Sequence, residues 1–428
     1  MRKLYSPALF CCLILFSACI APGPAVTPDD ATLPPSQKTP TSAISTEVPS
    51  EPNNLTLWVA PAFAPDSDDL AGTLLQQRLT AFEEANPGIN VDVRLKEKSG
   101  PGSLLNSLSA TSIAAPAVLP DIISLDPDSL NTATLKELLV PLEGLVQAPE
   151  APAWYDHAIS ASLVNGSFFA VPFASDTEVL AYRPFLFSTP PLTWSDVLNG
   201  PAPFLFPAGD PDAIFTLAQY LALDGSLFDD TGRPTLDPTI LADVLTFYGS
   251  AFSSGVLPPS ALRHETADET WPVLLAEGAT SAVSPLSVYL AESDSRSLSA
   301  VPLPTRSDPG VGFAETWSWA IVARDPSRQE LASRLIEWLS EPEFLGSWTY
   351  ALGMLPATAP ALAQWPEGPE VALASSLVTI VQPAPSAEVR VTFGPPLLGA
   401  VEAIIGGGAT PSSAALTASQ ALQVEEED

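Results

Sequence analysis

The chain has 428 residues, of which 17 are basic and 49 are acidic, and its formal net charge is −32 at pH 7. A surface of this sign repels nucleic acid and anionic lipid, so we exclude nucleic acid as a partner. The only cysteines are Cys11, Cys12 and Cys19, which leaves the rest of the chain without a disulfide framework, a thiolate nucleophile or a cysteine metal site.

The N-terminus has the pattern of a secretory signal. Arg2 and Lys3 precede an apolar run over residues 9–16 that is too short to span a bilayer as a mature helix. The run ends in small residues and Cys19, and residues 15–19 resemble the lipobox of bacterial lipoproteins, in which the cysteine is acylated. We therefore expect a lipoprotein signal peptide over residues 1–19 and a lipid anchor on Cys19. An ordinary cleaved signal with a spare thiol is the alternative.

Residues 20–54 form a segment of different composition. They are rich in Pro, Thr, Ser and Ala and contain no aromatic residue, so they lack the apolar surface that a folded core requires. We predict a disordered, semi-rigid tether that holds the folded part of the chain away from a membrane.

Strands and helices alternate in the first part of the folded chain. A strand is predicted over residues 55–59, and a helix with N-cap candidates at residues 66–69 follows it and stops at Asn86-Pro87-Gly88. A strand over residues 89–95, a helix over 104–111 and a strand over 121–124 come next. This alternation predicts a largely parallel sheet with helices on both faces.

Later segments continue the same pattern. We predict helices over residues 237–254, 327–339, 343–352 and 396–405, and a buried strand over residues 319–322. The sequence has no repeat at the periods of solenoid proteins. Its length therefore indicates two α/β domains.

Short motifs in a fixed order resemble the extracellular solute-binding proteins of ATP-binding-cassette importers, in particular the sugar-type family that includes maltose-binding protein. The resemblance covers nearly the whole chain after the tether, and the order of its motifs carries it. These motifs include Leu57-Trp58, Asn86-Pro87-Gly88, Pro120-Asp121-Ile122-Ile123, Val171-Pro172-Phe173, Thr193-Trp194-Ser195-Asp196 and Gly353-Met354-Leu355-Pro356.

The resemblance implies a periplasmic-binding-protein type II fold, an α/β architecture of two discontinuous lobes joined by crossing hinge strands. Lobe 1 is expected over residues 55–173 plus 310–353, and lobe 2 over 174–309 plus 354–424. The crossings are expected near residues 174–177 and 302–312. A ligand would bind in the cleft between the lobes and favour their closure.

Four candidate ligand-binding residues lie at the ends of predicted strands or at the first expected crossing. Trp58, Asp126 and Asp128 lie at the carboxyl ends of strands, where open α/β sheets place their ligands. A core position for Trp58 and a helix-capping role for the two aspartates are the alternatives. Asp176 lies at the first expected crossing, and the resemblance matches it to an acidic residue that lines the cleft.

A second group lies around the second crossing and near the C-terminus. Glu315, Trp317 and Trp319 come just after that crossing, and strand alternation places the two tryptophans on one face. We expect one of them to face the cleft. Phe393 stands where the resemblance implies a stacking aromatic, with a packed phenylalanine as the alternative. A sugar needs such carboxylates for its hydroxyls and such rings for its flat faces.

We therefore predict an extracytoplasmic, lipid-anchored and monomeric receptor that captures a small solute, with a mono- or oligosaccharide as the first choice, for membrane permease subunits. The aspartates at the helix start over residues 66–69, which the resemblance places facing the cleft, disfavour an anionic ligand. No cofactor, metal or catalytic residue is expected. The alternatives are a receptor or sensor of this fold for a peptide, polyamine or other small molecule, and a surface-anchored glycosidase.

Overall fold

The computed structural model describes residues 53–292, 297–307 and 310–424. The predicted signal peptide, Cys19 and residues 20–52 of the predicted tether lie outside these ranges. Residues 53 and 54, which we expected in the tether, instead begin strand β1 (Asn53–Val59), because their backbone pairs with that of strand β2 (Ile89–Leu95). Among the described helices, none is both long enough and apolar enough to cross a membrane.

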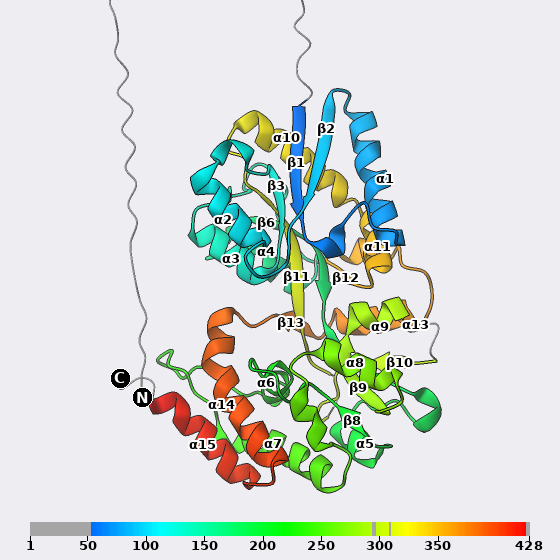
Figure 1. Ribbon diagram of the computed structural model, residues 1–428, viewed down its shortest axis with the longest axis vertical. Coiled ribbons are helices and arrows are strands. Elements are labelled where there is room, and N and C mark those ends of the chain that lie inside the picture. The colour runs from blue at the N-terminus through cyan, green and yellow to red at the C-terminus, as the bar shows by residue number, and fades with distance from the viewer. Residues whose placement is uncertain (1–52, 293–296, 308–309, 425–428) are drawn as a thin grey trace, which may run out of the picture. The chain divides into compact units, whose positions relative to one another are not determined.

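One part of the molecule is built on a seven-stranded sheet (Figure 1). We call this sheet and the helices packed on it the first lobe. Its strand order is β12-β6-β11-β3-β1-β2, and β13 pairs with β11 off this path. The remaining strands of this sheet are β3 (Ile122–Leu125), β6 (Ala170–Asp176), β11 (Gly312–Ile321), β12 (Leu355–Pro356) and β13 (Val381–Pro383).

Strand direction in this sheet differs from the expectation of a largely parallel sheet. β1 runs parallel to β2 and β3, but β11 runs antiparallel to both β3 and β6. The reason is that β11 re-enters the sheet close to the point where β6 leaves it, with Glu315 paired to Asp176. The chain must therefore run back along β6.

A four-stranded sheet with the order β10-β7-β9-β8 defines the second lobe. Its strands are β7 (Glu178–Tyr182), β8 (Phe204–Leu205), β9 (Ser281–Pro285) and β10 (Ser299–Val301). A two-stranded hairpin of β4 (Leu163–Val164) and β5 (Ser167–Phe168) lies apart from both sheets. Single 3-10 turns occur at η1 (Pro61–Phe63), η2 (Pro116–Val118), η3 (Pro184–Leu186) and η4 (Pro259–Arg263).

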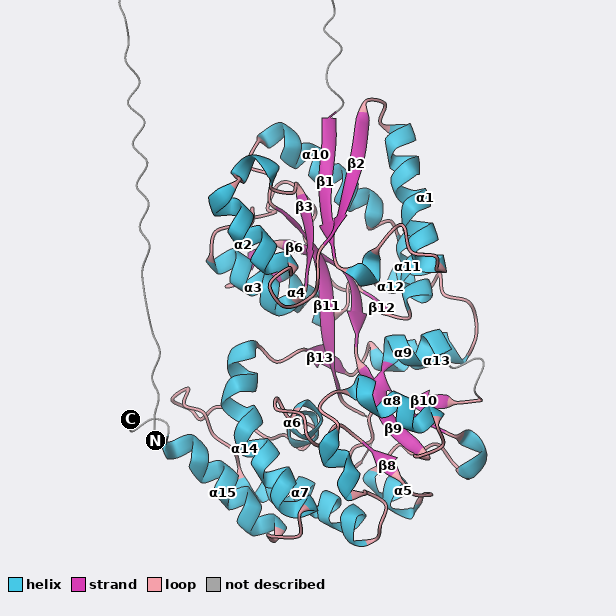
Figure 2. Ribbon diagram, viewed as in Figure 1, coloured by secondary structure: helices cyan, strands magenta, loops and turns pink. Residues whose placement is uncertain are grey.

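Helices surround each sheet (Figure 2). The first lobe has α1 (Leu70–Ala85), α2 (Leu104–Ala114), α3 (Pro127–Leu135), α4 (Asp156–Ser162), α10 (Pro326–Leu339), α11 (Pro342–Leu352) and α12 (Ala359–Leu362). The second lobe has α5 (Trp194–Asn199), α6 (Ile214–Leu221), α7 (Pro238–Ser253), α8 (Ala267–Leu275), α9 (Leu286–Glu292), α13 (Pro369–Leu377), α14 (Ala387–Ile405) and α15 (Pro411–Val424).

Side-chain caps explain where several helices begin. Asp69 accepts a hydrogen bond from the Gly72 amide at the start of α1, and Asp126 accepts one from the Ser129 amide at the start of α3. Asp325 caps α10, and Thr193 with Asp196 forms a capping box at α5. These short polar residues fix helix starts locally, which is why the sequence alone indicates them.

Aromatic rings fill the core of the first lobe beneath β11. Phe173 stacks on Trp319 with ring centroids 4.3 Å apart and on Trp348 at 5.4 Å. Phe63 meets Phe173 edge-on at 5.0 Å and Trp317 at 5.1 Å. Edge-to-face and offset packing of this kind adds stability beyond the area buried. Both tryptophans of β11 therefore belong to one buried cluster.

Several segments of the chain connect the two lobes. The chain leaves the first sheet at Thr177 and returns between β10 and β11. After α12 it enters α13 of the second lobe, pairs with the first sheet again at β13, and continues into α14. The expected boundary after residue 353 needs correction, because β12 still pairs with β6 and α12 still contacts α11. The expected helix start at residue 396 is also wrong. α14 begins at Ala387 and contains Pro395 and Pro396 in its interior.

A buried carboxylate ties together the strands at the base of the first sheet. Asp121 is 3% exposed, and its Oδ2 accepts a hydrogen bond from the Thr56 amide at 2.7 Å. Arg328 of α10 donates to both carboxylate oxygens, at 2.6 and 2.5 Å, and also to the Asn54 carbonyl. The Asp121 carbonyl accepts from the Val322 amide, so β1, β3, β11 and α10 meet at this residue.

Replacing Asp121 tests this junction. We expect Asp121→Asn to lower the free energy of unfolding by about 2 kcal/mol, because the buried carboxylate loses its charge-assisted hydrogen bonds from Arg328, whose side chain is 37% exposed. Urea unfolding followed by tryptophan fluorescence measures the change. The control Asp92→Asn removes an exposed ion pair with Arg94 and should cost less than about 0.5 kcal/mol. Equal effects of the two substitutions would contradict the role given to Asp121.

Candidate ligand-binding site

A cavity of about 750 Å³ lies between the lobes. Volumes of this size are typical of small-molecule sites. The first lobe lines it with the segment after β2, the start of α3, and β11. The second lobe contributes β7, the loop after β8, the start of α8, and α14. Its charged lining residues are Lys98, Asp126, Asp128, Asp176, Glu178, Asp210, Asp212, Glu265, Asp268, Glu315 and Arg390.

Strand pairing brings two carboxylates to the hinge side of the cavity. Asp176 at the end of β6 and Glu315 of β11 are direct partners in the antiparallel ladder. Asp176 also accepts hydrogen bonds from the Ser287 amide at 3.1 Å and the Ser287 hydroxyl at 2.5 Å, at the start of α9. Burial raises the pKa of Asp176 to about 6, and the hydrogen bonds from Ser287 limit the shift. Asp176 therefore links the first sheet to a helix of the second lobe.

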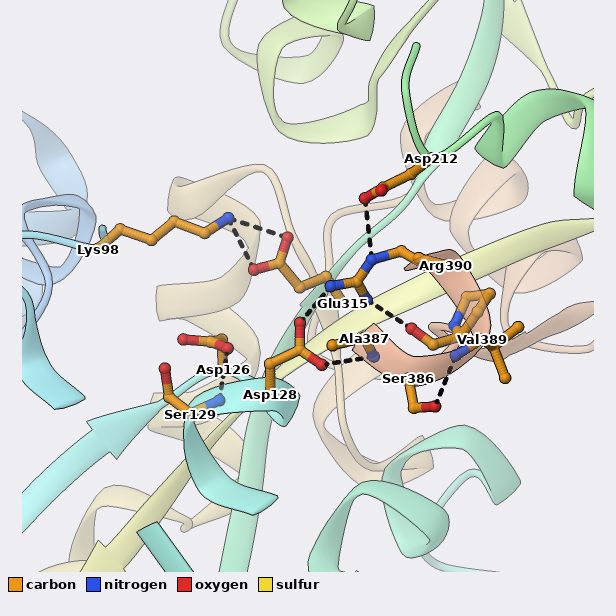
Figure 3. A network of polar contacts seen from close by, with 11 residues as sticks. Lys98, Asp126, Asp128, Ser129, Asp212, Glu315, Ser386, Ala387, Val389 and Arg390 are labelled. Atoms are coloured by element: carbon orange, nitrogen blue, oxygen red, sulfur yellow. Dashed lines mark hydrogen bonds and ion pairs between the residues drawn. The ribbon is translucent and has the colours of Figure 1, made fainter. Parts of the chain in front are cut away.

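Lys98 and Glu315 form an ion pair at the cavity wall (Figure 3). The Lys98 ammonium lies 2.7 Å from Oε1 and 3.0 Å from Oε2 of Glu315. Burial disfavours the charged amine, but Glu315, Asp126 and Asp176 together hold the pKa of Lys98 above its usual range. The pair fixes the segment after β2 against β11.

Arg390 of α14 links the two lobes (Figure 3). Its guanidinium binds the Asp128 carboxylate of α3 in the first lobe and, through Nε at 3.0 Å, the Asp212 carboxylate of the second lobe. The Ala387 amide at the start of α14 donates to Asp128 at 3.2 Å. Although burial opposes the charged form, Asp128 and Asp212 keep the pKa of Arg390 above its usual value. We call this contact the interlobe clasp.

The second lobe contributes carboxylates from two loops that are held together at Gly209. The Gly209 amide donates to the His264 carbonyl at 3.0 Å. A Cβ atom at Gly209 would lie 2.4 Å from the Leu262 carbonyl oxygen, so only glycine permits this approach. The contact sets the spacing between Asp210 on one loop and the residues that precede α8 on the other.

Glu178 is the most perturbed carboxyl group of the cavity. It begins β7, and no hydrogen bond or ion pair of its side chain occurs in the described part of the chain. Burial raises the pKa of Glu178 to about 8, and the nearby carboxylates of Asp210, Asp176 and Asp268 raise it further. Glu178 is therefore mostly protonated at neutral pH.

The predicted site residues divide into two groups. The four carboxylates Asp126, Asp128, Asp176 and Glu315 all line the cavity. Asp126 and Asp128 also have structural partners, as a helix cap and in the interlobe clasp. The aspartates at positions 66, 68 and 69 do not line it, and Asp69 caps α1 instead.

The four predicted aromatic residues lie in cores instead of on the cavity wall. Trp58 and Trp317 are 3% and 4% exposed, and Trp319 and Phe393 are fully buried. Phe393 packs edge-on against Phe228 within the second lobe, with ring centroids 5.8 Å apart. We expected one of these rings to face the cleft and stack on a ligand, but in the structure none of the four lines the cavity. Large apolar rings bury most surface when they pack between sheet and helices.

Sequence reasoning missed several cavity residues. Lys98 follows β2 as Asp126 follows β3, so the strand-end rule that selected Asp126 also applied to Lys98. Arg390 lies near the start of α14, and the wrong helix start at residue 396 concealed it. Glu178, Asp210 and Asp268 come from the second lobe, where no local pattern distinguishes them from other acidic residues.

These features define a two-lobed α/β protein with a polar cavity between the lobes. The sequence profile of the bacterial extracellular solute-binding proteins matches residues 77–372, and the chain belongs to this family. Comparison with curated protein sequences gave no match.

Solved structures of sugar-binding proteins share the fold. The maltose-binding periplasmic protein of Listeria monocytogenes, in complex with maltose, has a TM-score of 0.69 and 14% identity, covering 88% of this chain and 98% of that chain. The cyclic α-maltosyl-1,6-maltose binding protein of Arthrobacter globiformis has a TM-score of 0.69 and 17% identity, covering 87% and 98%. A cyclo/maltodextrin-binding protein complexed with maltotetraose has a TM-score of 0.68 and 19% identity, covering 89% and 98%. The likeness confirms the predicted type II periplasmic-binding-protein fold.

The raised pKa of Glu178 predicts a pH-dependent stability. The group has an ordinary pKa of 4.5 and a folded pKa of about 8, so the folded chain keeps a proton that the unfolded chain releases. Stability from this group is present below about pH 4.5 and is lost as pH rises towards about 8. We expect Glu178→Gln to stabilise the protein relative to the wild type, increasingly so from about pH 5 to about pH 8.

Urea unfolding of both proteins across this pH range measures the difference. Glu330→Gln on the exposed side of α10 is the matched control, and its difference from the wild type should stay constant with pH. A pH-independent difference for Glu178→Gln would contradict the assigned protonation state.

Proposed function

We propose that this chain is a lipid-anchored, extracytoplasmic receptor that captures a small solute between its lobes and delivers it to the permease subunits of an ATP-binding-cassette importer. Membership of the extracellular solute-binding family supports the location and the role. The observation that carries the proposal is the polar cavity of about 750 Å³ at the junction of two lobes between which the chain passes repeatedly.

The proposed solute is a molecule of oligosaccharide size that is rich in hydrogen-bonding groups. The cavity volume suits a di- or trisaccharide-sized guest. Structural neighbours of this fold were solved with maltose and maltotetraose, which supports a sugar as the starting hypothesis. The lining carboxylates provide acceptors for hydroxyl or amino groups.

Closure of the lobes on the solute is the proposed mechanism. The segments that pass between the sheets at Thr177 and around β13 are short, so rotation there requires few backbone changes. The interlobe clasp of Arg390, Asp128 and Asp212 already connects the two sides of the cavity. A solute that contacts both lobes adds interactions which exist only in the closed arrangement and shifts the population towards it.

We further propose that the protein releases the bound solute without changing it chemically. A panel of neutral oligosaccharides, amino acids, peptides and polyamines should contain a solute that raises the melting temperature by several degrees at a concentration about a hundredfold above its Kd. Small-angle scattering should show a smaller radius of gyration with that solute, and mass spectrometry should recover it intact. Release of shorter products would instead support the glycosidase alternative.

The lipid anchor has its own test. We expect Cys19→Ala to move the full chain, expressed in a bacterial host, from the membrane fraction to the soluble extracytoplasmic fraction, because the acylated side chain is lost. Cys12→Ala is the matched control and should leave the chain in the membrane fraction. Membrane retention of Cys19→Ala would contradict the anchor.

A further inference from the structure

The lining of the cavity carries an excess of negative charge. Nine Asp and Glu residues line it, of which Glu178 is mostly protonated at neutral pH, against the two basic residues Lys98 and Arg390. Both basic groups already have partners, Lys98 with Glu315 and Arg390 with Asp128 and Asp212. Within the described part of the chain, the other lining carboxyl groups form no ion pair with a basic side chain. They are Asp126, Asp176, Glu178, Asp210, Glu265 and Asp268.

Two adjacent residues at the hinge leave hydrogen-bonding groups unused. Thr177 lines the cavity and is 5% exposed, and its buried Oγ1 has no hydrogen-bond partner among the described residues. The neighbouring Glu178 carboxyl has none either. Buried polar groups without partners are costly in a folded protein, so their presence at a cavity wall indicates a guest that supplies the missing partner.

The carboxylates are too widely spaced to favour a metal ion as the ligand. Within the described ranges, no three His, Cys, Asp or Glu side chains converge closely enough to hold a metal. The charges are spread instead over β6, β7, the loop after β8 and the start of α8. Separated acceptors suit an extended solute with several separated positive groups.

The cavity is also poor in the rings that neutral sugars use. Among the residues that the structure describes, Phe313 is the only aromatic residue that lines it, since the tryptophans of β11 are buried in the first-lobe core. Stacking on sugar faces therefore contributes little here. Charge-assisted hydrogen bonds are about twice as strong as neutral ones and are the main interaction that this lining offers.

From this lining we infer that the solute carries two or more protonated amino groups, which bind between Glu178, Asp210 and Asp268 of the second lobe and Asp126 of the first. The inference rests on the proposed function and specifies its ligand class. A linear polyamine and an amino-substituted oligosaccharide share this chemistry.

The protonation state of Glu178 supports the inference independently. The charged groups nearest to it come from each bordering element: Asp176 on β6, Asp210 after β8 and Asp268 on α8. Their repulsion, together with burial, keeps the pKa of Glu178 at about 8. A bound ammonium group relieves this repulsion, so binding near pH 7 should release a proton.

Titration calorimetry with the full chain tests the inference. The probes are spermidine as a linear polyamine, the trisaccharide of glucosamine as an amino sugar, and maltotriose as the neutral control. We expect at least one amine to bind, to weaken by more than about tenfold between about 50 and 500 mM salt, and to release protons into the buffer. The amine that binds more tightly shows whether the solute is a polyamine or an amino sugar.

Substitutions of cavity residues test whether the amine binds in the cavity. We expect Glu178→Gln and Asp268→Asn each to weaken amine binding by about tenfold, through loss of a charge-assisted hydrogen bond. Glu330→Gln removes the same charge from an exposed site outside the cavity and should change the affinity by less than about twofold. The use of two cavity variants covers the case in which one of them fails to fold.

Two results would overturn the inference. Saturable binding of maltotriose, but of neither amine, would refute the cationic ligand class and leave the receptor function standing. Amine binding that Glu178→Gln and Asp268→Asn do not weaken would place the amine outside this cavity and would also refute the inference. Failure of every solute in the broader thermal screen would count against the proposed function itself.

Discussion

The antiparallel pairing of β6 with β11 is the constraint on which the site depends. It aligns Glu315 with Asp176, and a buried hydrogen bond of 2.8 Å between the Ser175 and Thr316 hydroxyls reinforces the register beside them. β6 leads directly into the second lobe at Thr177, and the first residues of β11 also pair with β13. A shift in this register would move a carboxylate away from the cavity and would also displace the chain at Thr177 and at β13.

Charge explains why the cavity is suited to capture. Each lobe brings carboxylates towards the other, and repulsion between them opposes close approach unless a positive group lies between. Arg390 supplies one such group in the interlobe clasp, where it contacts Asp128 on one side and Asp212 on the other. The proposed cationic solute would act in the same way at Glu178, so that ligand binding and lobe closure become one event.

Sequence patterns predicted the elements well where the signal is local. The expected cap at Asp69 begins α1, and Asp126, for which capping was the alternative reading, caps α3 and also lines the cavity. Predictions failed where packing decides the outcome. Trp319 and Phe393 are fully buried, and α14 continues through Pro395 and Pro396 from an earlier start. The sequence shows that an aromatic side chain will avoid water, but it does not show whether the ring packs in the core or lines the cavity.

The sequence by itself determined the α/β class, the family and the acidic character of the molecule, because periodicity, motif order and composition are properties of the chain. Only the tertiary structure decided which charged residues form ion pairs. Lys98 and Glu315 are 217 residues apart, and Arg390 and Asp128 are 262 apart, yet both pairs are in contact. Such pairings depend on strand register and on the course of the chain between two lobes, and no local pattern encodes the distance between residues so far apart.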